Sequence, residues 1–261
     1  MSKHNPSAFV DVQGHRLEYQ RIGAASTAGP TLVFLHEGLG SIGQWREFPA
    51  RVARDTGLPA IIYARYGYGQ SDVLQQAFAV DFMHREALES LPEFLRLLGI
   101  ERPLLVGHSD GASIALIYAG AGHPLDGMVA MAPHVFVEDI SIAGISAAAR
   151  AFETSELRRR LARYHRDPEK TFRGWNDVWL SPAFRSWNIE SYLPGVKCPL
   201  LAIQGQGDEY GSMAQVDAIA RGAGGPVKVL KLEDCGHSPH KDQPDVVAGA
   251  IATFVRACAG G

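Results

Sequence analysis

The sequence predicts an α/β fold with a doubly wound, mostly parallel sheet, and three observations support this. Short hydrophobic runs alternate with amphipathic, helical patterns along most of the chain. The runs are of strand length and almost uniformly apolar, which is typical of strands buried on both faces of a parallel sheet. The chain has 261 residues, of which 46% are hydrophobic, so it is long enough to bury a large core.

Each element follows from its own pattern. The predicted strands are the apolar runs at residues 31–36, 60–64, 103–108, 127–133, 199–205 and 227–232. The predicted helices between and after them cover residues 81–99, 111–121, 213–222 and 244–260. The last helix opens with Pro244, a residue that the first turn of a helix tolerates. The alternation of strands and helices indicates the doubly wound arrangement.

Two segments depart from this alternation. Residues 8–23 alternate polar and apolar side chains around Gly14, which predicts an antiparallel hairpin at one edge of the sheet. Residues 135–190 are helical in pattern throughout and rich in aromatic side chains, and the strand–helix rhythm resumes at Pro199. We therefore expect an α/β core in two parts with a helical lid inserted between them, and the boundaries fall at residues 1–134, 135–190 and 191–261.

Composition excludes several classes of function. The formal net charge is -3, and the basic cluster at residues 158–160 is interleaved with apolar residues, as on the solvated face of an amphipathic helix. We therefore expect no nucleic-acid partner. The first ten residues, MSKHNPSAFV, carry no secretory signal, and no apolar run approaches the roughly 18 residues of a membrane span, so no membrane partner is expected. Oligomeric state is left open.

The three cysteines point to the redox setting. Cys198, Cys235 and Cys258 lie far apart, without the spacing of a metal site. An odd number of cysteines in a chain of this size indicates reduced thiols and a cytoplasmic protein. We expect no metal and no cofactor.

Ser109 lies in the pentapeptide GHSDG, directly after the buried run at 103–108 and before a helix of small residues. A strand–turn–helix of this composition is a nucleophile elbow. Gly107 and Gly111 let the backbone turn sharply and let strand and helix approach closely. The turn exposes the serine hydroxyl at the carboxyl ends of the strands, where open α/β sheets bind ligands.

A serine nucleophile needs a base and an orienting acid, which should follow it in the order acid then histidine. Asp208 lies in a glycine-rich loop after the next-to-last strand, and His237 follows the last strand. Glu209 is the rival acid and His240 the rival base, and we favour Asp208 and His237.

Acyl transfer also needs two amides that stabilise the developing oxyanion. One is expected from Asp110, the residue after the nucleophile. The other is expected from Gly38 in the loop that follows the run at 31–36, with Leu39 as the alternative. We interpret His36, at the start of this loop, as a residue that anchors it.

With these motifs in place, the chain resembles the α/β-hydrolase fold serine hydrolases over nearly its whole length. The matching features are the loop at 36–40, the RYGYGQSD turn at 65–72, the elbow, and the Asp208 and His237 loops. Two positions depart from the family pattern. Glu37 stands where the family's first loop usually has glycine after histidine, and Ala64 replaces the aspartate before the turn that follows the fourth strand.

The resemblance implies hydrolysis through an acyl-enzyme on Ser109. We expect a small to medium, largely apolar carboxylic ester, bound under the lid against Trp175, Trp179 and Trp187. One alternative is hydrolysis of a carbon–carbon bond in ring-cleavage products, for which Arg65 or the lid arginines would bind a substrate carboxylate. Another is a non-catalytic ligand receptor.

Asp110 supports a further alternative. The elbow is similar to that of valacyclovir hydrolase, the biphenyl-hydrolase-like protein, in which an aspartate after the serine contacts a substrate ammonium. The residue therefore has two interpretations. Its carboxylate either stabilises the first turn of a helix by about 0.3–1 kcal/mol, or it binds the amino group of an amino-acid ester.

Overall fold

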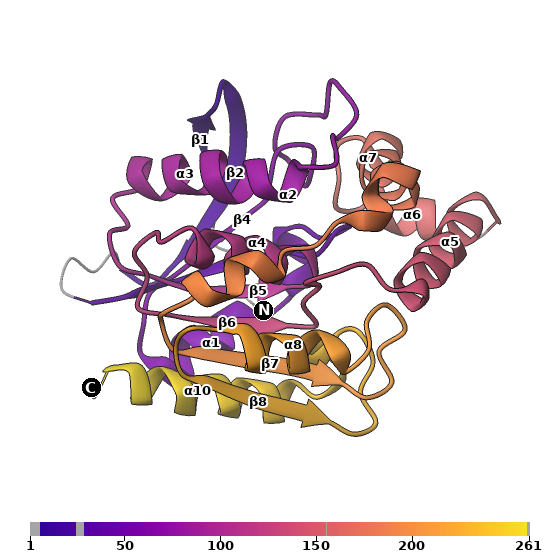
Figure 1. Ribbon diagram of the computed structural model, residues 1–261. Coiled ribbons are helices and arrows are strands. Elements are labelled where there is room, and N and C mark those ends of the chain that lie inside the picture. Colours follow the sequence, from indigo (N-terminus) through magenta and orange to yellow (C-terminus); the bar gives the residue numbers. More distant parts are fainter. Residues whose placement is uncertain (1–5, 25–28, 155, 260–261) are drawn as a thin grey trace.

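The computed structural model describes residues 6–24, 29–154 and 156–259, and within these ranges the chain forms one eight-stranded sheet in the order β1-β2-β4-β3-β5-β6-β7-β8 (Figure 1). From β4 to β8, neighbouring strands pair in parallel, while β1 and β2 form an antiparallel hairpin at one edge. The strands are β1 Ala8–Val12, β2 His15–Ile22, β3 Thr31–Leu35, β4 Ala60–Tyr63, β5 Pro103–His108, β6 Gly127–Met131, β7 Leu200–Gly205 and β8 Val227–Leu232. The predicted fold class is confirmed.

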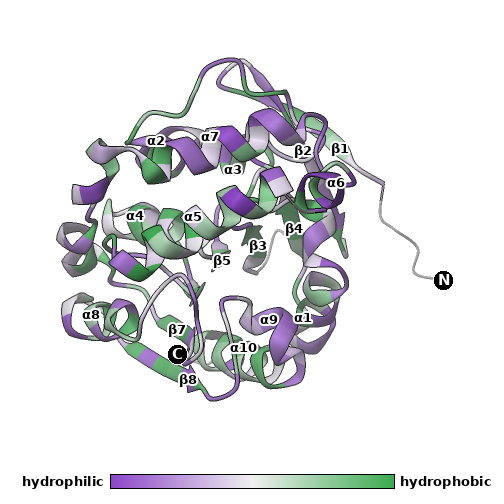
Figure 2. Cartoon of the chain, turned by 90° about the vertical axis from the view of Figure 1, so that its right-hand side faces the viewer, coloured by the Kyte–Doolittle hydropathy of each residue, from purple (hydrophilic) through white to green (hydrophobic). Residues whose placement is uncertain are grey.

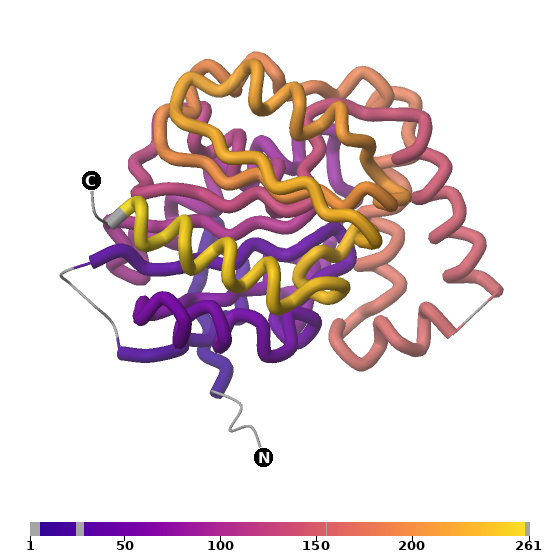
Figure 3. The backbone as a smooth tube through the Cα atoms, turned by 90° about the horizontal axis from the view of Figure 1, so that it is seen from below, coloured from indigo at the N-terminus to yellow at the C-terminus, as the bar shows by residue number. Residues whose placement is uncertain are grey.

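Helices cover both faces of the sheet, and each face has its own apolar cluster (Figures 1 and 2). One face is covered by α1 (Phe48–Thr56) and α10 (Pro244–Ala259), which cross below the strands side by side (Figure 3). The other is covered by α2 (Phe82–Arg85), α3 (Leu91–Leu97), α4 (Asp110–Gly120) and α8 (Ala214–Gly222). Residue 260, at the end of the last predicted helix, lies outside the described residues.

The predicted helix at 81–99 is continuous but not regular. A π-helical segment, η2 (Glu86–Ser90), lies between α2 and α3. Pro92 follows it in the first turn of α3 and has no amide hydrogen to donate to the preceding turn. A wider turn before a proline accommodates this loss, and π segments of this kind are usually single turns within a helix.

The strand β8 differs from the prediction of uniform burial. Lys228 and Lys231 are exposed, and of the other residues in the strand only Leu232 is fully buried. The reason is its position, because β8 is an edge strand that pairs only with β7. Charged side chains on an edge strand also oppose pairing with other chains.

The segment that we interpret as a lid is helical, as expected from its pattern. It contains α5 (Asp139–Thr154), α6 (Leu157–Leu161), α7 (Pro168–Leu180) and the 3-10 helix η3 (Pro182–Ser186). In Figure 1 these helices lie beyond the ends to which the arrows of β7 and β8 point, apart from the helices that cover the sheet. The connections back to β7 run through η4 (Glu190–Gly195). Within the ranges described above, no helix is long and apolar enough to cross a membrane.

Candidate active site

Ser109 follows β5 directly and precedes α4, in the elbow expected from the sequence. Its backbone has φ 53° and ψ -121°, a combination that is unfavourable for a residue with a side chain. The two glycines make this turn possible. A Cβ on Gly107 would lie 2.4 Å from the carbonyl oxygen of Gly111, and a Cβ on Gly111 would lie 2.1 Å from that of Leu35. Strand and helix therefore approach as closely as the motif requires.

The structure brings the three predicted triad residues together. The hydroxyl of Ser109 lies 2.9 Å from His237 Nε2, and His237 Nδ1 lies 2.8 and 2.9 Å from the two carboxylate oxygens of Asp208. A carboxylate only accepts, so in the neutral imidazole the proton lies on Nδ1. Nε2 is then free to accept the serine proton, which is the arrangement that general-base activation requires.

Asp208 is built to stay ionised beside the histidine. Burial alone would raise the pKa of this carboxyl, but the contact with His237 and hydrogen bonds from the amides hold it below its usual range. The donors besides His237 are the amides of Tyr210 and Gly211, at 2.8 and 3.2 Å, and the side-chain amide of Gln204 at 2.7 Å.

The rival residues occupy other positions. The Glu209 carboxylate accepts from the backbone amide of His237, at 3.3 Å, and not from its ring. His240 is buried against Trp45 and Phe48, with ring centroids 4.8 and 5.4 Å away. The geometry thus favours Asp208 and His237 for the catalytic pair.

The loop at residues 36–40, which is expected to supply an oxyanion donor, is held by hydrogen bonds of His36 and Arg65. His36 anchors it, since the ring accepts from the Arg65 amide and donates to the carbonyl of Glu37 at 2.7 Å. The Arg65 guanidinium donates to the carbonyls of His36 and Glu37 at 2.5 and 3.1 Å. In a trans peptide the amide of Gly38 points opposite to the Glu37 carbonyl.

This leaves three amides available at the site. The amides of Gly38, Leu39 and Asp110 donate no hydrogen bond to another residue in the described ranges, so Leu39 stays the alternative to Gly38. Gly38 also lies against the lid, because a Cβ there would be 2.0 Å from the indole nitrogen of Trp175. Both predicted donors are therefore unoccupied and close to the elbow.

Several buried polar atoms, at Asp110 next to Ser109 and at two tryptophans of the lid, make no hydrogen bond of ordinary geometry. Both carboxylate oxygens of Asp110 and the indole nitrogens of Trp179 and Trp187 are buried without a hydrogen bond of ordinary geometry to a described residue, although the Trp179 indole lies close enough to Asp110 to act on its pKa. Burial raises the pKa of Asp110 to about 6, although Arg65 and the Trp179 indole favour its ionised form.

His134, which follows β6, is a residue of this region that sequence reasoning missed. Its ring lies 5.1 Å from Trp179 and 5.8 Å from His237, measured between centroids, and its Nδ1 is buried without a partner in the part of the chain that the structure describes. Burial lowers the pKa of His134 to about 3, so the ring is neutral at physiological pH. Its position at the carboxyl end of a predicted parallel strand is the signal that was available.

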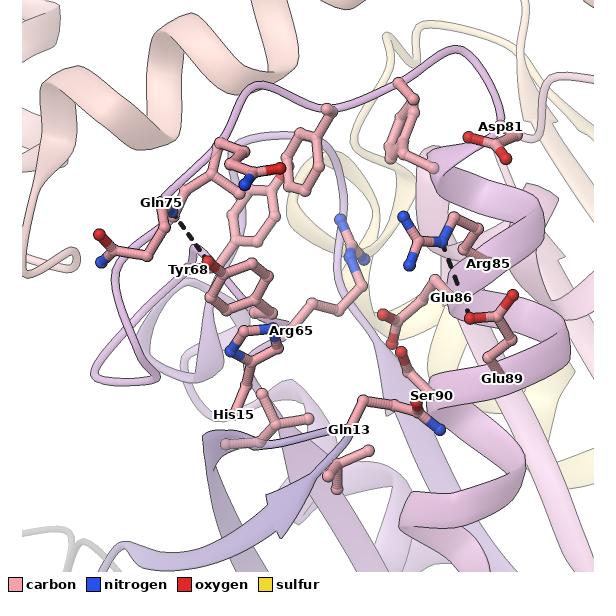
Figure 4. Close-up of a pocket in the computed structure, with 18 of the residues that line it drawn as sticks. Gln13, His15, Arg65, Tyr68, Gln75, Asp81, Arg85, Glu86, Glu89 and Ser90 are labelled. Atoms are coloured by element: carbon pink, nitrogen blue, oxygen red, sulfur yellow. Dashed lines mark hydrogen bonds and ion pairs between the residues drawn. The ribbon is translucent and has the colours of Figure 1, made fainter.

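A cavity of about 470 Å³ lies beside the site and does not include the triad (Figure 4). Its walls come from the β1–β2 turn, the loop at 74–79, and α2 with η2. Arg65 belongs to both the cavity and the site, because it lines this cavity and its guanidinium donates to a carbonyl of the oxyanion loop. None of Trp175, Trp179 and Trp187 lines it, so the predicted substrate position under the lid is a different place.

Comparison with known proteins places this geometry in a family. Residues 32–250 match the model of the alpha/beta hydrolase family. The chain belongs to this family. Its enzymes are hydrolases, and the solved structures discussed below share the fold.

The individual proteins that the chain resembles share 30% or less of their sequence with it in the aligned regions. A proline iminopeptidase of Lactobacillus delbrueckii subsp. lactis is 30% identical over 105 residues, which is 40% of this chain and only 36% of the relative. The enol-lactonase of Burkholderia xenovorans has a TM-score of 0.75 at 18% identity and covers 95% of this chain and 100% of its own. The meta-cleavage product hydrolase of Pseudomonas fluorescens has a TM-score of 0.76 at 16% identity, over 96% and 97% of the two chains.

Proposed function

We propose that this hydrolase cleaves small to medium carboxylic esters through an acyl-enzyme on Ser109. The observation that carries the proposal is the continuous contact from Ser109 through His237 to Asp208, in the tautomer that base catalysis needs. No cofactor is required by this chemistry, because the nucleophile, base and oxyanion donors all come from the chain.

The steps follow from these positions. Ser109 attacks the ester carbonyl as its proton passes to His237 Nε2, and Asp208 stabilises the imidazolium. The tetrahedral oxyanion is bound by the amides of Asp110 and Gly38. His237 then gives its proton to the departing alcohol, and water, activated by the same imidazole, hydrolyses the acyl-enzyme. We place the acyl group under the lid, against the three tryptophans Trp175, Trp179 and Trp187.

The test is Ser109→Ala on a panel of p-nitrophenyl esters of increasing acyl length. Loss of a triad member lowers turnover on the order of 10⁴-fold or more. Ser186→Ala, at an exposed serine of the lid, is the matched control and should be as active as the unmodified protein. Undiminished hydrolysis by Ser109→Ala would exclude the proposed nucleophile.

A specific observation favours a second candidate, hydrolysis of amino-acid esters. The Asp110 carboxylate is buried beside Ser109, and neither oxygen has a hydrogen-bond partner among the described residues. The Arg65 guanidinium is one cation near this carboxylate, and a substrate ammonium would add a direct hydrogen-bond donor to its oxygens. In keeping with this, the curated relative described above is named for a proline imino group.

The carbon–carbon hydrolase alternative is less well supported by the site. It needs a cation for the substrate carboxylate, yet Arg65 is buried and donates to two loop carbonyls. The lid arginines Arg158 and Arg159 form exposed ion pairs with Glu169 and Glu156, at 3.0 and 2.6 Å. The name of the meta-cleavage product hydrolase keeps this reaction a candidate, and a product assay on a vinylogous diketone acid tests it.

The receptor alternative is tested with a fluorophosphonate probe, which labels an activated serine and leaves an inert one unmodified. Labelling of Ser109 supports an enzyme. The cytoplasmic setting remains our proposal from the cysteine pattern, and the partner that we propose is a small-molecule ester alone.

A further inference from the structure

One stretch of the lid, residues 164–175, lies against the backbone of the oxyanion loop and of the turn that follows it. A Cβ on Gly38 would be 2.0 Å from the indole nitrogen of Trp175, and a Cβ on Gly43 would be 3.1 Å from a ring carbon of Tyr164. Both glycines leave room for an aromatic ring of the lid. The lid therefore packs directly on the loop that carries the proposed oxyanion donor.

His165, in this stretch, is 3% exposed and makes a hydrogen bond at each ring nitrogen. Its Nε2 lies 3.0 Å from the carbonyl oxygen of Leu39, and its Nδ1 lies 3.0 Å from the amide nitrogen of Gly69. A carbonyl only accepts and an amide nitrogen only donates, so the proton lies on Nε2 and Nδ1 accepts. Burial lowers the pKa of His165, so the ring is neutral at physiological pH. One tautomer therefore satisfies both contacts.

The lid also holds the turn that begins at Arg65. The backbone amide of Arg166 donates to the Gly69 carbonyl at 3.0 Å, and the Thr171 hydroxyl donates to the Gly67 carbonyl at 2.7 Å. The Arg65 guanidinium at the start of this turn donates to two carbonyls of the oxyanion loop. These contacts reach the oxyanion loop through the turn, whereas His165 contacts it directly.

The Leu39 carbonyl lies at a critical point of the oxyanion loop. On one side of the candidate donors, the Glu37 carbonyl accepts from the Arg65 guanidinium at 3.1 Å. Carbonyl and amide share one rigid peptide plane, so this bond also fixes the Gly38 amide. On the other side, the Leu39 carbonyl accepts from His165. The Gly38 and Leu39 amides, the two candidates for the oxyanion donor, therefore lie between two carbonyls that are held in place.

We propose that His165 is a positioning residue through which the lid holds the oxyanion loop in its catalytic geometry. The proposal rests on the proposed function, because that acyl transfer needs the oxyanion donor. Loss of one such donor lowers kcat by about 10²–10³-fold, and displacements of about 1 Å lower rates on the order of 10²-fold. Both ring nitrogens of His165 are used by the chain, so the residue acts through the loop and leaves substrate binding unaffected.

The test compares two variants of His165 that each keep one of its contacts. The side-chain nitrogen of glutamine can occupy the position of Nε2, and the side-chain oxygen of asparagine that of Nδ1. His165→Gln keeps the donor to the Leu39 carbonyl, and its kcat should stay within about threefold of the unmodified protein. His165→Asn keeps only the acceptor for Gly69, so its kcat should fall by about 10- to 100-fold, with KM changed less than about twofold.

A residue that only fastens the lid predicts equal kcat in the two variants or a larger loss in His165→Gln, and either result would overturn the proposal. His165→Ala, which loses both contacts, should lose as much kcat as His165→Asn, and it decides the question if His165→Asn does not fold. Undiminished kcat in His165→Ala would also refute the positioning role. Lys170→Gln, at an exposed lysine of the same stretch, is the control.

A trifluoromethyl ketone reports the oxyanion hole without turnover. Ser109 Oγ bonds to the ketone carbon as the serine proton passes to His237, and the ketone oxygen becomes the oxyanion that the hole binds. Its dissociation constant, measured by fluorine NMR, should rise in His165→Asn by the factor that kcat/KM loses, and should be little changed in His165→Gln.

The ketone also separates the two proposals, because its binding needs no ester hydrolysis. A protein that binds the ketone on Ser109 but hydrolyses no ester contradicts the proposed function. In that case weaker binding by His165→Asn than by His165→Gln still supports the positioning role, and equal binding refutes it. A protein that neither binds the ketone nor hydrolyses an ester overturns both proposals.

Discussion

The Asp110→Asn substitution separates the two interpretations of the Asp110 carboxylate by the sign of its effect on stability. The side chain is 1% exposed, and burial is the main cause that raises its pKa from 3.8 to about 6. A carboxyl with a raised pKa in the folded state destabilises the fold wherever it is ionised. Asn removes the charge while it keeps the shape and the backbone amide.

The magnitude follows from the shift. Each pKa unit corresponds to about 1.4 kcal/mol, so about two units destabilise the folded protein by about 3 kcal/mol at pH 7. The sign of the effect on stability follows from the protonation state of Asp110 at each pH. Below about pH 4 both folded and unfolded states are protonated and the penalty is absent. It grows as the unfolded state ionises and is complete above about pH 6. A carboxylate that served the helix dipole would instead stabilise by about 0.3–1 kcal/mol.

We therefore expect Asp110→Asn to raise the free energy of unfolding by up to about 3 kcal/mol at neutral pH and to leave it nearly unchanged at about pH 4. Urea unfolding at the two pH values measures the difference. In the same variant, hydrolysis of an α-amino ester should lose about 10- to 100-fold in kcat/KM, because a charge-assisted hydrogen bond is worth about 1.5–3 kcal/mol.

The matched ester with hydrogen in place of the amino group is the control substrate, and its kcat/KM should be unchanged. A variant that is less stable at neutral pH, with both esters affected equally, would assign the carboxylate to the helix and refute the argument.

Other predictions follow from the same contacts. In the unmodified protein, the ratio of kcat/KM for the amino ester to that for its neutral analogue should rise between about pH 5 and 7, as Asp110 ionises; a pH series on both substrates removes the pH dependence that the two reactions share. Asp208→Asn should lower kcat by about 10⁴-fold, because the amide favours the wrong tautomer of His237, and steady-state kinetics with an intact fold by circular dichroism check this. Gly107→Ala should destabilise by roughly 1–3 kcal/mol in urea unfolding, since its Cβ meets backbone atoms of Gly111 and Ala112; equal stability would show that β5 and α4 can separate.

Much of the fold was predictable because the parallel strands are buried on both faces. Continuous apolar runs of strand length predict β3 to β7 directly. The glycines of the elbow predict that strand and helix pack closely, as the structure shows at Gly107 and Gly111. The triad loops were predictable for a related reason. Residues directly after parallel strands meet at one edge of the sheet, so Asp208 and His237 could be placed beside Ser109 from position alone.

What escaped prediction depends on side-chain direction. Nothing in the pattern of the loop shows that Glu37 turns behind the elbow to His108, or that the Arg65 guanidinium is used by carbonyls of the chain. His134 was overlooked because the sequence does not show whether a single histidine after a strand points into the site or into the core. The exposure of β8 depends on its place at the sheet edge, which strand order decides and local sequence does not.

The buried polar atoms around Asp110 give the amino-ester proposal a further consequence. The Asp110 oxygens, the Trp179 and Trp187 indole nitrogens and His134 Nδ1 make no hydrogen bond of ordinary geometry to a described residue, although the Trp179 indole lies close enough to Asp110 to act on its pKa. Each buried polar group left unsatisfied costs about 1–3 kcal/mol, which a purely apolar acyl group cannot recover. A substrate that brings an ammonium for Asp110 and a hydrogen-bonding group for the indoles recovers it on binding. The preference should therefore appear as discrimination against apolar esters of equal size, and the Asp110 carboxylate, as the charged member of the group, should account for most of it.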